Sequence, residues 1–437
     1  MSNKIYPIGI QNFEKIRNDG YFYIDKTALM YQMVKTGSYY FLSRPRRFGK
    51  SLLISTLEAY FQGKKELFEG LAVEKLEKDW IKHPILHLDL NIEKYDTPES
   101  LDKILNDNLE YWESQYGTRP SETSFSLRFA GIIQRACEKT GQRVVILVDE
   151  YDKPMLQAIG NEELQKQFRN TLKPFYGALK TKDGYIKFAL LTGVTKFGKV
   201  SVFSDLNNLD DISMWNEYVE ICGVSEREIH ENLEAELHEF AAARGITYDK
   251  LCEDLRECYD GYHFTHNSIG MYNPFSLLNA FKRKEFGSYW FETGTPTYLV
   301  KLLKKHHYDL ERMAHEETDV QVLNSIDSES TNPIPVIYQS GYLTIKGYDE
   351  EFGMYRLGFP NREVEEGFIR FLLPFYANVN KVESPFEIQK FVREVRSGDY
   401  NSFFHRLQSF FADTTYEVIR DQELHYENVL FIVFKLL

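Results

Sequence analysis

The chain has 437 residues, which is enough for about three domains at roughly 150 residues each. Hydrophobic residues make up 43% of it, charged residues 27% and aromatic residues 15%, and this composition excludes an intrinsically disordered protein. The 52 Lys and Arg residues against 65 Asp and Glu residues give a net charge of −13. Such an acidic protein cannot hold a polyanion by overall attraction, so any site for a nucleotide or nucleic acid must be a local basic patch.

The cysteines and the apolar runs predict the compartment. The four cysteines have neither the paired spacing of a zinc site nor the density of a disulfide framework, which favours a reducing environment. The first residues lack the apolar core of a signal peptide, and the longest apolar runs, 144–148 and 429–434, are far too short to span a membrane. We therefore predict a cytoplasmic protein without a membrane partner.

The first part of the chain alternates strand-like and helix-like patterns. Short runs rich in β-branched and aromatic residues predict strands at 39–43, 85–89, 144–149 and 186–192. Apolar residues at helical spacing predict helices at 50–61, 98–113 and 122–139. Strands separated by helices of this length indicate an α/β fold, with a parallel sheet covered on both faces. We expect this core domain to occupy residues 1–215.

A helical lid domain is expected at residues 216–330. A charged helical pattern over 225–244 is followed by Gly245, a typical residue for the end of a helix. Further helical patterns occupy 248–257, 273–283 and 295–305. The third of these four helices begins with Asn273 and Pro274, a typical helix start.

Residues 331–420 predict a small α+β module. Two segments of strand-like composition, 336–348 and 352–361, are joined by a charged turn at 349–351, which indicates a hairpin. Helical patterns then run from Arg362 to the end of the chain. We predict a winged-helix-like module, followed by a separate segment at 421–437.

A phosphate-binding loop is predicted between the first strand and the helix that follows it. The segment Arg44-Pro45-Arg46-Arg47-Phe48-Gly49-Lys50-Ser51 has the Gly-Lys-Ser end of a Walker A motif, with Arg44 in place of the first glycine. In such a loop the backbone amides and the lysine hold phosphates, and the serine binds Mg²⁺. The alternative is a basic surface turn that begins a helix. We assign nucleotide binding to Arg46, Arg47, Phe48, Gly49, Lys50, Ser51 and Leu52.

The predicted strand 144–149 ends in two carboxylates, Asp149 and Glu150. Open α/β sheets bind ligands at the carboxyl ends of their strands. We therefore expect Asp149 to hold Mg²⁺, directly or through water, and Glu150 to orient or deprotonate the attacking water. Acidic residues often end strands, so it is the phosphate loop earlier in the chain that makes this pair specific. Asp152 is expected to support these residues at most.

The predicted strand 186–192 ends in a third polar cluster. Thr192 is a candidate catalytic residue that hydrogen-bonds the water or the γ-phosphate, and Lys196 is a candidate for stabilising charge there. The alternatives are a threonine that simply ends a strand and a solvated lysine.

Six motifs together resemble the AAA-ATPase-like family of bacteria such as Bacteroidetes and related anaerobes. In chain order they are YFYIDKT, RPRRFGKS, VDEYD, YDGYHF, YNPFSLL and FETGTPTYL. The family's usual loop shares the departure at Arg44. The resemblance implies a P-loop NTPase core, a helical lid and a winged helix that close around ATP or ADP. It also implies that Asp25, in the N-terminal segment 23–27, lies near the adenine, and that Pro296, in 294–296, touches the nucleotide.

The resemblance also bears on the end of the chain. Family members are commonly fused to a C-terminal PD-(D/E)XK nuclease-like domain, and residues 423–434 resemble its first helix. Such a nuclease needs an Asp or Glu two residues before a Lys to assemble its metal site, and no such pair occurs between Thr331 and Leu437. We expect no nuclease activity in this chain, and we expect the chain to be part of a longer protein. Nucleic acid would then be a partner only through the missing domain.

The leading hypothesis is a slow, Mg²⁺-dependent switch ATPase that regulates a nuclease-like effector. One alternative is a scaffold that holds ATP or ADP without hydrolysing it. A less favoured alternative is a P-loop kinase for a small molecule, since the sequence shows no acceptor site. Assembly into a homo-oligomer is left open.

Overall fold

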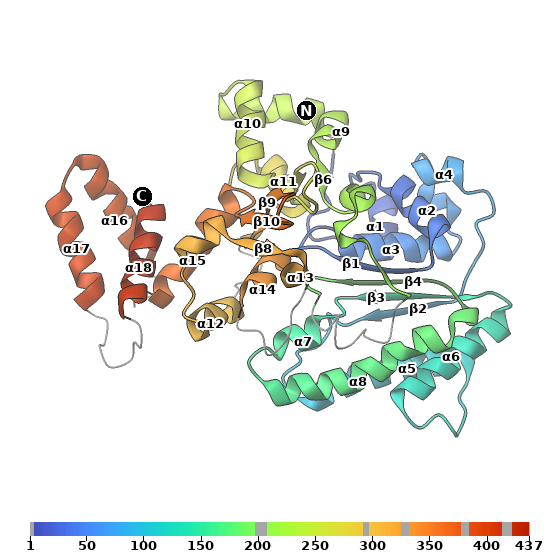
Figure 1. The fold of residues 1–437 in the computed structure, drawn as a ribbon. Helices are drawn as coiled ribbons and strands as arrows, with labels where there is room; N and C mark the ends of the chain where they lie inside the picture. The colour runs from blue at the N-terminus through green and yellow to red at the C-terminus, as the bar shows by residue number, and fades with distance from the viewer. Residues whose placement is uncertain are drawn as a thin grey trace.

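The computed structural model describes residues 4–196, 208–291, 297–324, 332–376, 384–412 and 422–436. A central sheet lies between two layers of helices, and the rest of the chain extends away from one end of this core (Figure 1).

The central sheet has five parallel strands in the order β2-β3-β4-β1-β5. Their bounds are β1 Tyr39–Ser43, β2 Ile85–Asp89, β3 Val144–Asp149, β4 Ile186–Gly193 and β5 Asp210–Asp211. The four longer strands lie where the sequence predicts them, and every residue of β1 and β3 is buried. In the register, Asp149 pairs with Asp89 of β2, and Thr192 pairs with Leu42 of β1. All the strand ends therefore meet at one edge.

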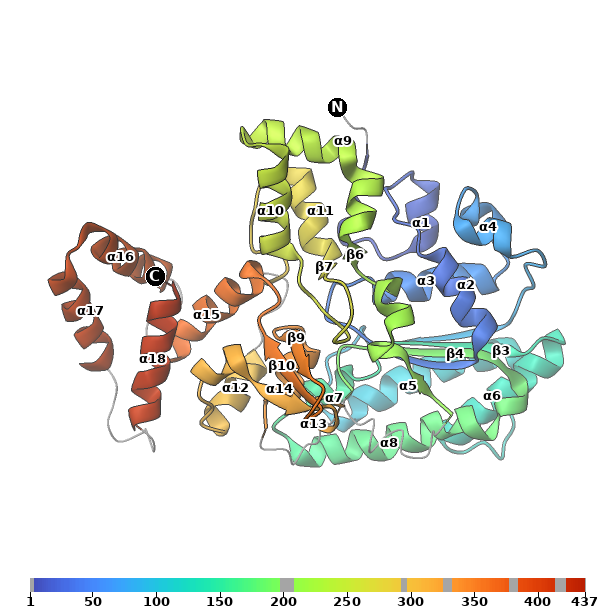
Figure 2. The ribbon, with the colours of Figure 1, turned by 45° about the horizontal axis from the view of Figure 1, so that its top comes forward.

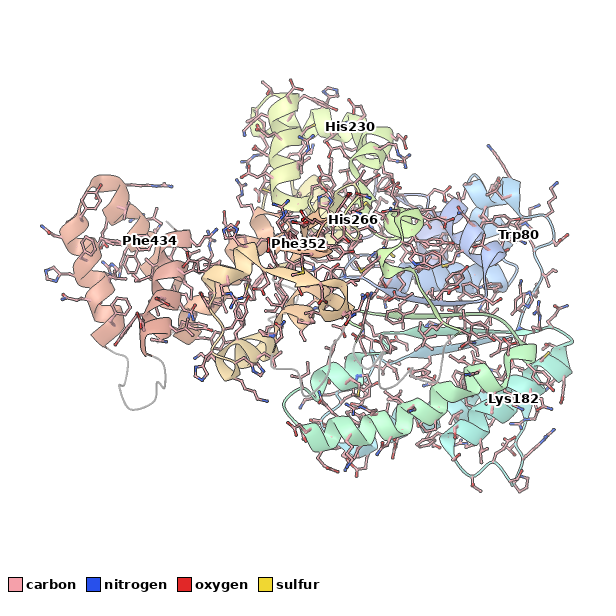
Figure 3. The ribbon with its side chains drawn as sticks, viewed as in Figure 1. Trp80, Lys182, His230, His266, Phe352 and Phe434 are labelled. Atoms are coloured by element: carbon pink, nitrogen blue, oxygen red, sulfur yellow. The ribbon has the colours of Figure 1, made fainter. Side chains whose placement is uncertain are left out.

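Helices cover both faces of this sheet, as predicted. One face carries α1 Phe13–Asn18, α2 Thr27–Thr36, α3 Lys50–Phe61 and α4 Ala72–Leu76, and the other carries α5 Pro98–Tyr116, α6 Phe125–Thr140, α7 Lys153–Gln157 and α8 Glu162–Thr181. Trp80 lies on the first side and Lys182 on the second (Figure 3). The short 3₁₀ helices are Lys65–Phe68, Asp183–Tyr185, Ile212–Met214, Asn216–Ile221 and Glu311–His315.

A helical lid lies at the end of the core from which the rest of the chain extends (Figure 2). It consists of α9 Glu226–Arg244, α10 Tyr248–Tyr259 and α11 Pro274–Arg283, together with a short strand pair, β6 Val224–Ser225 and β7 Met271–Tyr272. The side chain of Ser225 and that of Glu228 cap α9 reciprocally, and Gly245 ends α9 with a φ of 67°. Asn273 caps α11, as predicted. The strand pair was not predicted, because two residues leave no period to detect.

The C-terminal module combines a small antiparallel sheet with helices. Its elements are α12 Thr297–Lys305, β8 Glu317–Asp319, α13 Val320–Asn324, α14 Ile334–Gln339, β9 Thr344–Asp349, β10 Met354–Gly358 and α15 Arg362–Tyr376. The hairpin β9–β10 confirms the predicted turn at 349–351. The predicted strand over residues 336–339 is wrong, because these residues form the end of α14. A Pro in the first turn favours a helix start, and a short apolar run does not distinguish helix from strand.

Three further helices complete the chain: α16 Ser384–Ser397, α17 Tyr400–Ala412 and α18 Gln422–Leu436. They lie farthest from the central sheet in both views (Figures 1 and 2). Val429, Ile432 and Val433 of α18 are buried. The Asn428 side chain accepts from the Leu310 amide at 2.7 Å and donates to the Tyr308 carbonyl at 3.1 Å. In the structure α18 therefore packs as part of the C-terminal module.

Within the described ranges, none of the helices combines the length and the apolar character that a membrane span requires.

Candidate functional site

The loop between β1 and α3 has the backbone geometry of an anion-binding turn. Gly49 precedes α3 with a φ of 99°, in the left-handed region that favours glycine. No side chain caps the start of α3. The first amides of this helix are therefore not used by a capping side chain, and amides at such a helix start are suited to hold an anion.

A cavity of about 780 Å³ opens in front of this loop. Predicted site residues form part of its wall: Arg46, Arg47, Gly49, Lys50, Ser51, Leu52 and Glu150. A cavity of this size lies in the range of small-molecule sites. A larger cavity of about 1080 Å³ lies between α10, α15, α16 and α18, and its wall contains none of the predicted site residues.

Lys50 is buried at the bottom of the loop, with 4% of its surface exposed. Its Nζ donates to the carbonyl oxygens of Arg44 at 3.1 Å and Pro45 at 3.4 Å, and it lies 3.4 Å from Oε1 of Glu150. The carboxylate contact is longer than a tight charged hydrogen bond of about 2.8 Å. A phosphate oxygen can therefore replace Glu150 as the partner of this ammonium group at little cost.

Asp149 and Thr192 lie side by side at the ends of β3 and β4. Thr192 Oγ1 donates to Oδ1 of Asp149 at 2.5 Å, and the Glu150 amide donates to the same oxygen at 3.1 Å. Both side chains are buried. The contacts Lys50–Glu150 and Asp149–Thr192, with the peptide bond between Asp149 and Glu150, bring four of the five predicted catalytic and metal-binding residues to one place. The fifth, Ser51, follows Lys50 directly.

The backbone at Glu150 places its side chain in the cavity rather than in the sheet. Its φ of 53° lies in the left-handed region, which costs about 1 kcal/mol for a residue with a side chain. Such strain is typical of functional positions. It ends β3 abruptly, so that Asp149 belongs to the buried edge and Glu150 to the cavity wall.

The residues that could hold a magnesium ion are Ser51 and Asp149. Ser51 lies in the first turn of α3, on the cavity wall. A hydroxyl and a carboxylate are ligands that Mg²⁺ takes, and it usually keeps several of its waters. Because Asp149 is buried behind the wall, a water between it and the ion fits this arrangement. The described residues contain no cluster of three His, Cys, Asp or Glu side chains that would form a separate metal site.

Asp152 fixes the loop that follows β4. It is fully buried, Oδ1 accepts from the Val194 amide at 3.2 Å, and Oδ2 accepts from the amide and hydroxyl of Thr195, both at 2.6 Å. Burial raises the pKa of Asp152 to about 7, and the nearby charge of Glu150 adds to this shift. Asp152 thus holds the loop after β4 from the protein interior, and its supporting role in the site stays a prediction.

The three arginines of the loop do not form one basic patch. Arg47 is exposed and lies 5.0 Å from the Phe275 ring centre, and Arg46 reaches the Tyr342 hydroxyl at 3.5 Å. Arg44 is instead buried, donating to the carbonyl oxygens of Ser43, Ser213 and Tyr218. Burial lowers its pKa to about 10. The local basic patch that an acidic nucleotide-binding protein is expected to have therefore does not include Arg44, because its guanidinium is buried in the protein.

A smaller apolar cavity of about 110 Å³ adjoins the phosphate loop. Phe48, Gly49 and Leu52 form one side of it, and the N-terminal segment forms another through Tyr23, Ile24 and Lys26. The segment expected near the adenine therefore lies beside the loop.

Asp25 and Pro296 are the other two residues predicted to contact the nucleotide. The Asp25 carboxylate accepts from the Thr27 amide and hydroxyl and from the Ala72 amide, at 2.6 to 2.8 Å. It is thus bound to the starts of α2 and α4. Pro296 lies outside the described residues.

Lys196 is turned away from the cavity. Its Nζ lies 2.8 Å from Oδ2 of Asp211 and donates to Oδ1 of Asn324 at 2.5 Å. With 4% exposure, it is a buried structural cation. Neither alternative from the sequence, a charge in the active site or a solvated lysine, describes it.

Several residues of the site carry no motif. The N-terminal residues Pro7 to Gln11 line the cavity of about 780 Å³ in front of the phosphate loop, as do Asn91 after β2 and Lys153 in α7. Lys153 Nζ donates to the backbone carbonyl of Asn91 at 2.5 Å. The Arg46 carbonyl accepts from the indole of Trp290 at 2.9 Å and from the Asn273 side chain at 3.4 Å. Only Asn273 had a signal in the sequence, as a helix cap.

Comparisons with known proteins give a family model, a similar protein and a solved structure. The family model described as "Predicted AAA-ATPase" matches residues 7–203. A protein of Azotobacter chroococcum mcd 1, described as an uncharacterized protein in the vnfD 5′ region, is 39% identical over 381 residues, which cover 86% of this chain and 71% of the other. The solved structure of the Walker-type ATPase paby2304 of Pyrococcus abyssi is 12% identical, with a TM-score of 0.37, covering 83% of this chain and 97% of that one.

Proposed function

Because this chain belongs to the AAA-ATPase-like family, we propose that it binds ATP with Mg²⁺ in the 780 Å³ cavity and hydrolyses it slowly to ADP and phosphate. The observation that carries the proposal is the convergence of Lys50, Glu150, Asp149 and Thr192 at one edge of the sheet. Three separate stretches of sequence supply these residues, and only the fold brings them together.

The position of each of these residues supports one role in phosphate binding or hydrolysis. The first amides of α3 and the Lys50 ammonium hold the β- and γ-phosphates. The phosphates displace Glu150 from Lys50, and the freed carboxylate then orients the attacking water and takes its proton. Thr192 keeps Asp149 in place through its hydrogen bond. A Mg²⁺ ion held by Ser51 and, through water, by Asp149 would neutralise charge on the phosphates.

The apolar cavity beside Leu52 supports a base-binding role. It lies next to the loop and is walled by apolar side chains of the N-terminal segment, β6 and α11. A flat heterocycle removes its faces from water in such a cavity while its phosphates lie in the larger one. This arrangement supports a nucleotide as the ligand rather than a simple polyphosphate.

The test of binding is Lys50→Met, measured by titration with ATP and Mg²⁺. We expect affinity to fall by about 100-fold, since one buried charge-assisted contact to phosphate is worth about 3 kcal/mol. Lys64→Met is the matched control, because Lys64 pairs with Glu14 and is part-exposed. If Lys50→Met binds ATP as tightly as the unaltered chain, the proposed site is wrong.

The test of hydrolysis is Glu150→Gln, measured as phosphate release at saturating ATP. We expect the rate to fall by about 100-fold or more, as removal of a general base does, while ATP binding is kept or strengthened because Glu150 no longer competes for Lys50. Glu163→Gln, on the exposed side of α8, is the control. Equal rates in the two variants would favour the alternative, a scaffold that holds nucleotide without using Glu150 as a base.

The finer hypothesis, regulation of a nuclease-like effector, rests on the family resemblance. The helical lid and the C-terminal module are the parts through which nucleotide state would reach such an effector. The test is a nuclease assay, with and without ATP, of a family member that carries a nuclease-like domain. If the protein were instead a small-molecule kinase, ATP turnover would depend on an added acceptor.

A further inference from the structure

One short helix of the C-terminal module touches both halves of the candidate site. In α14, the Gln339 side chain accepts from the Lys196 amide at 2.5 Å, in the loop after β4. Gly341, just beyond α14, lies against Pro45 in the phosphate loop, where an added Cβ would stand 2.5 Å from Cβ of Pro45. Gly341 also has a φ of 88°, so a larger residue is excluded both by conformation and by space.

We infer that α14 is the element that carries nucleotide state from the site to the C-terminal module, with Lys196 and Gln339 as its positioning residues. The inference rests on the proposed function, because it requires a nucleotide in the cavity.

The first step is the connection from Asp149 to the loop after β4. Asp149 accepts from the Thr192 hydroxyl, and Thr192 is followed directly by Gly193. An added Cβ at Gly193 would stand 2.5 Å from Oδ1 of Asp152, so β4 ends in close contact with the segment after β3. Asp152 and the Tyr151 hydroxyl, which donates to the Thr195 carbonyl at 2.9 Å, hold the rest of the loop.

The second step is the anchor of this loop on α13 and α14. The Lys196 amide is held by Gln339, and the Lys196 ammonium is held by Asn324 at the end of α13. The Gln339 side chain also donates to the Leu323 carbonyl. The two helices are thus hydrogen-bonded to the loop and to each other at one point.

The third step is a return path from this anchor to the phosphate loop. Asp211, the ion-pair partner of Lys196, accepts from the Ser213 amide at 3.0 Å. Ser213 in turn accepts from the Ser43 amide through its hydroxyl, at 2.9 Å, and from the Arg44 guanidinium through its carbonyl, at 2.7 Å. Both loops therefore share partners on one side of the sheet edge.

The burial of this connection explains why it transmits movement. Residues 191–196 are all buried. A close-packed, hydrogen-bonded segment cannot absorb a displacement by bending into solvent, so a shift at Asp149 or Thr192 is passed to its neighbours. Separating Lys196 from Asp211 would break an ion pair at 2.8 Å that involves a buried ammonium, which favours their movement together.

The experiment is hydrogen–deuterium exchange of the full chain, without nucleotide and with AMP-PNP and Mg²⁺. We expect exchange to slow in the phosphate loop, residues 44–52, and to change by at least about fivefold in residues 320–324 and 334–339. Gln339→Ala and Asn324→Ala keep the Lys196–Asp211 pair, and each should abolish the change in α13 and α14 while slowing at 44–52 remains. Lys250→Met is the control, since its exposed ion pairs lie within α10.

Three outcomes would overturn the inference. If 44–52 slows in the unaltered chain but α13 and α14 do not change, nucleotide binds and the coupling is absent. If both variants keep the change, coupling does not run through Gln339 and Asn324. If 44–52 itself does not respond, the proposed function fails, and the inference fails with it.

Discussion

Two buried lysines at the same edge of the sheet behave as opposites. Lys50 and Lys196 are both 4% exposed. Lys50 has two carbonyl oxygens of its own loop as acceptors and a carboxylate at 3.4 Å. Lys196 has a carboxylate at 2.8 Å and an amide oxygen at 2.5 Å, from elements distant in sequence.

The difference separates a region suited to exchange partners from one suited to stay fixed. The loop around Lys50 faces a cavity, and its ammonium loses little when a phosphate replaces Glu150. Residues 191–196, which end in Lys196, are buried, and they join the core to α13 and α14. Burial alone therefore does not distinguish the two lysines, whereas the distance from each ammonium to its carboxylate partner does.

The largest expected effect compares the two lysines in stability. Lys196→Met should lower the free energy of unfolding by about 3 kcal/mol, because it removes the buried ammonium that pairs with Asp211 and leaves this half-buried carboxylate beside an apolar side chain. Lys50→Met should change it by less than about 1 kcal/mol, or raise it, because a poorly paired buried ammonium is replaced by a side chain that prefers the interior. Urea unfolding of both variants, followed by circular dichroism, measures the contrast. Equal losses would contradict the comparison.

The strands were predicted well because their signal is local. The runs at 39–43, 85–89 and 144–149 give β1, β2 and β3 with the same bounds, and β4 extends one residue further. The C-terminal module was predicted less well. Residues 336–339 are helical, and Gln339 is held by the Lys196 amide, a contact that no local pattern contains. The strand Glu317–Asp319 is polar and is defined by its pairing with β10.

The site divides in the same way. Lys50, Asp149, Glu150 and Thr192 could be grouped from the sequence, because parallel strands place their carboxyl ends at one edge. The directions of Arg44 and Lys196 could not be foreseen. A loop cation turns toward whichever acceptors tertiary structure supplies, and here these are Ser213 and Tyr218 for Arg44, and Asp211 and Asn324 for Lys196.

A smaller effect is expected at Thr192, which lies between the two regions. Thr192→Val keeps the shape of the side chain but removes the donor to Asp149. We expect ATP hydrolysis to fall by about tenfold, the cost of one misplaced hydrogen bond at the reacting group, with ATP affinity unchanged. Thr181→Val, at the end of α8, is the control. A normal rate in Thr192→Val would show that Asp149 needs no support from β4.

The smallest effect on stability is expected for an ion pair that is only partly buried and lies outside the proposed phosphate site. His87 of β2 lies 3.1 Å from Glu58 of α3, and each side chain is about one-third exposed. Burial lowers the pKa of His87, but the hydrogen bond and charge of Glu58, helped by Asp149 and Asp89, outweigh it and raise the pKa above 6.5. Because the folded protein favours the protonated ring, the stabilisation is complete below about pH 6. It should then be lost as pH rises through the raised pKa.

In His87→Gln this pH dependence should disappear. At pH 6 the free energy of unfolding of the variant should differ from that of the unaltered chain by less than about 1 kcal/mol, as for other partly exposed pairs. Urea unfolding at pH 6 and pH 9 measures it. The two curves should converge at the higher pH, since the unaltered ring is then neutral and the pair carries no charge attraction. If the difference in the free energy of unfolding instead grows with pH, His87 is held neutral by burial. The exposed fraction of an ion pair would then not predict its contribution to stability in this sheet.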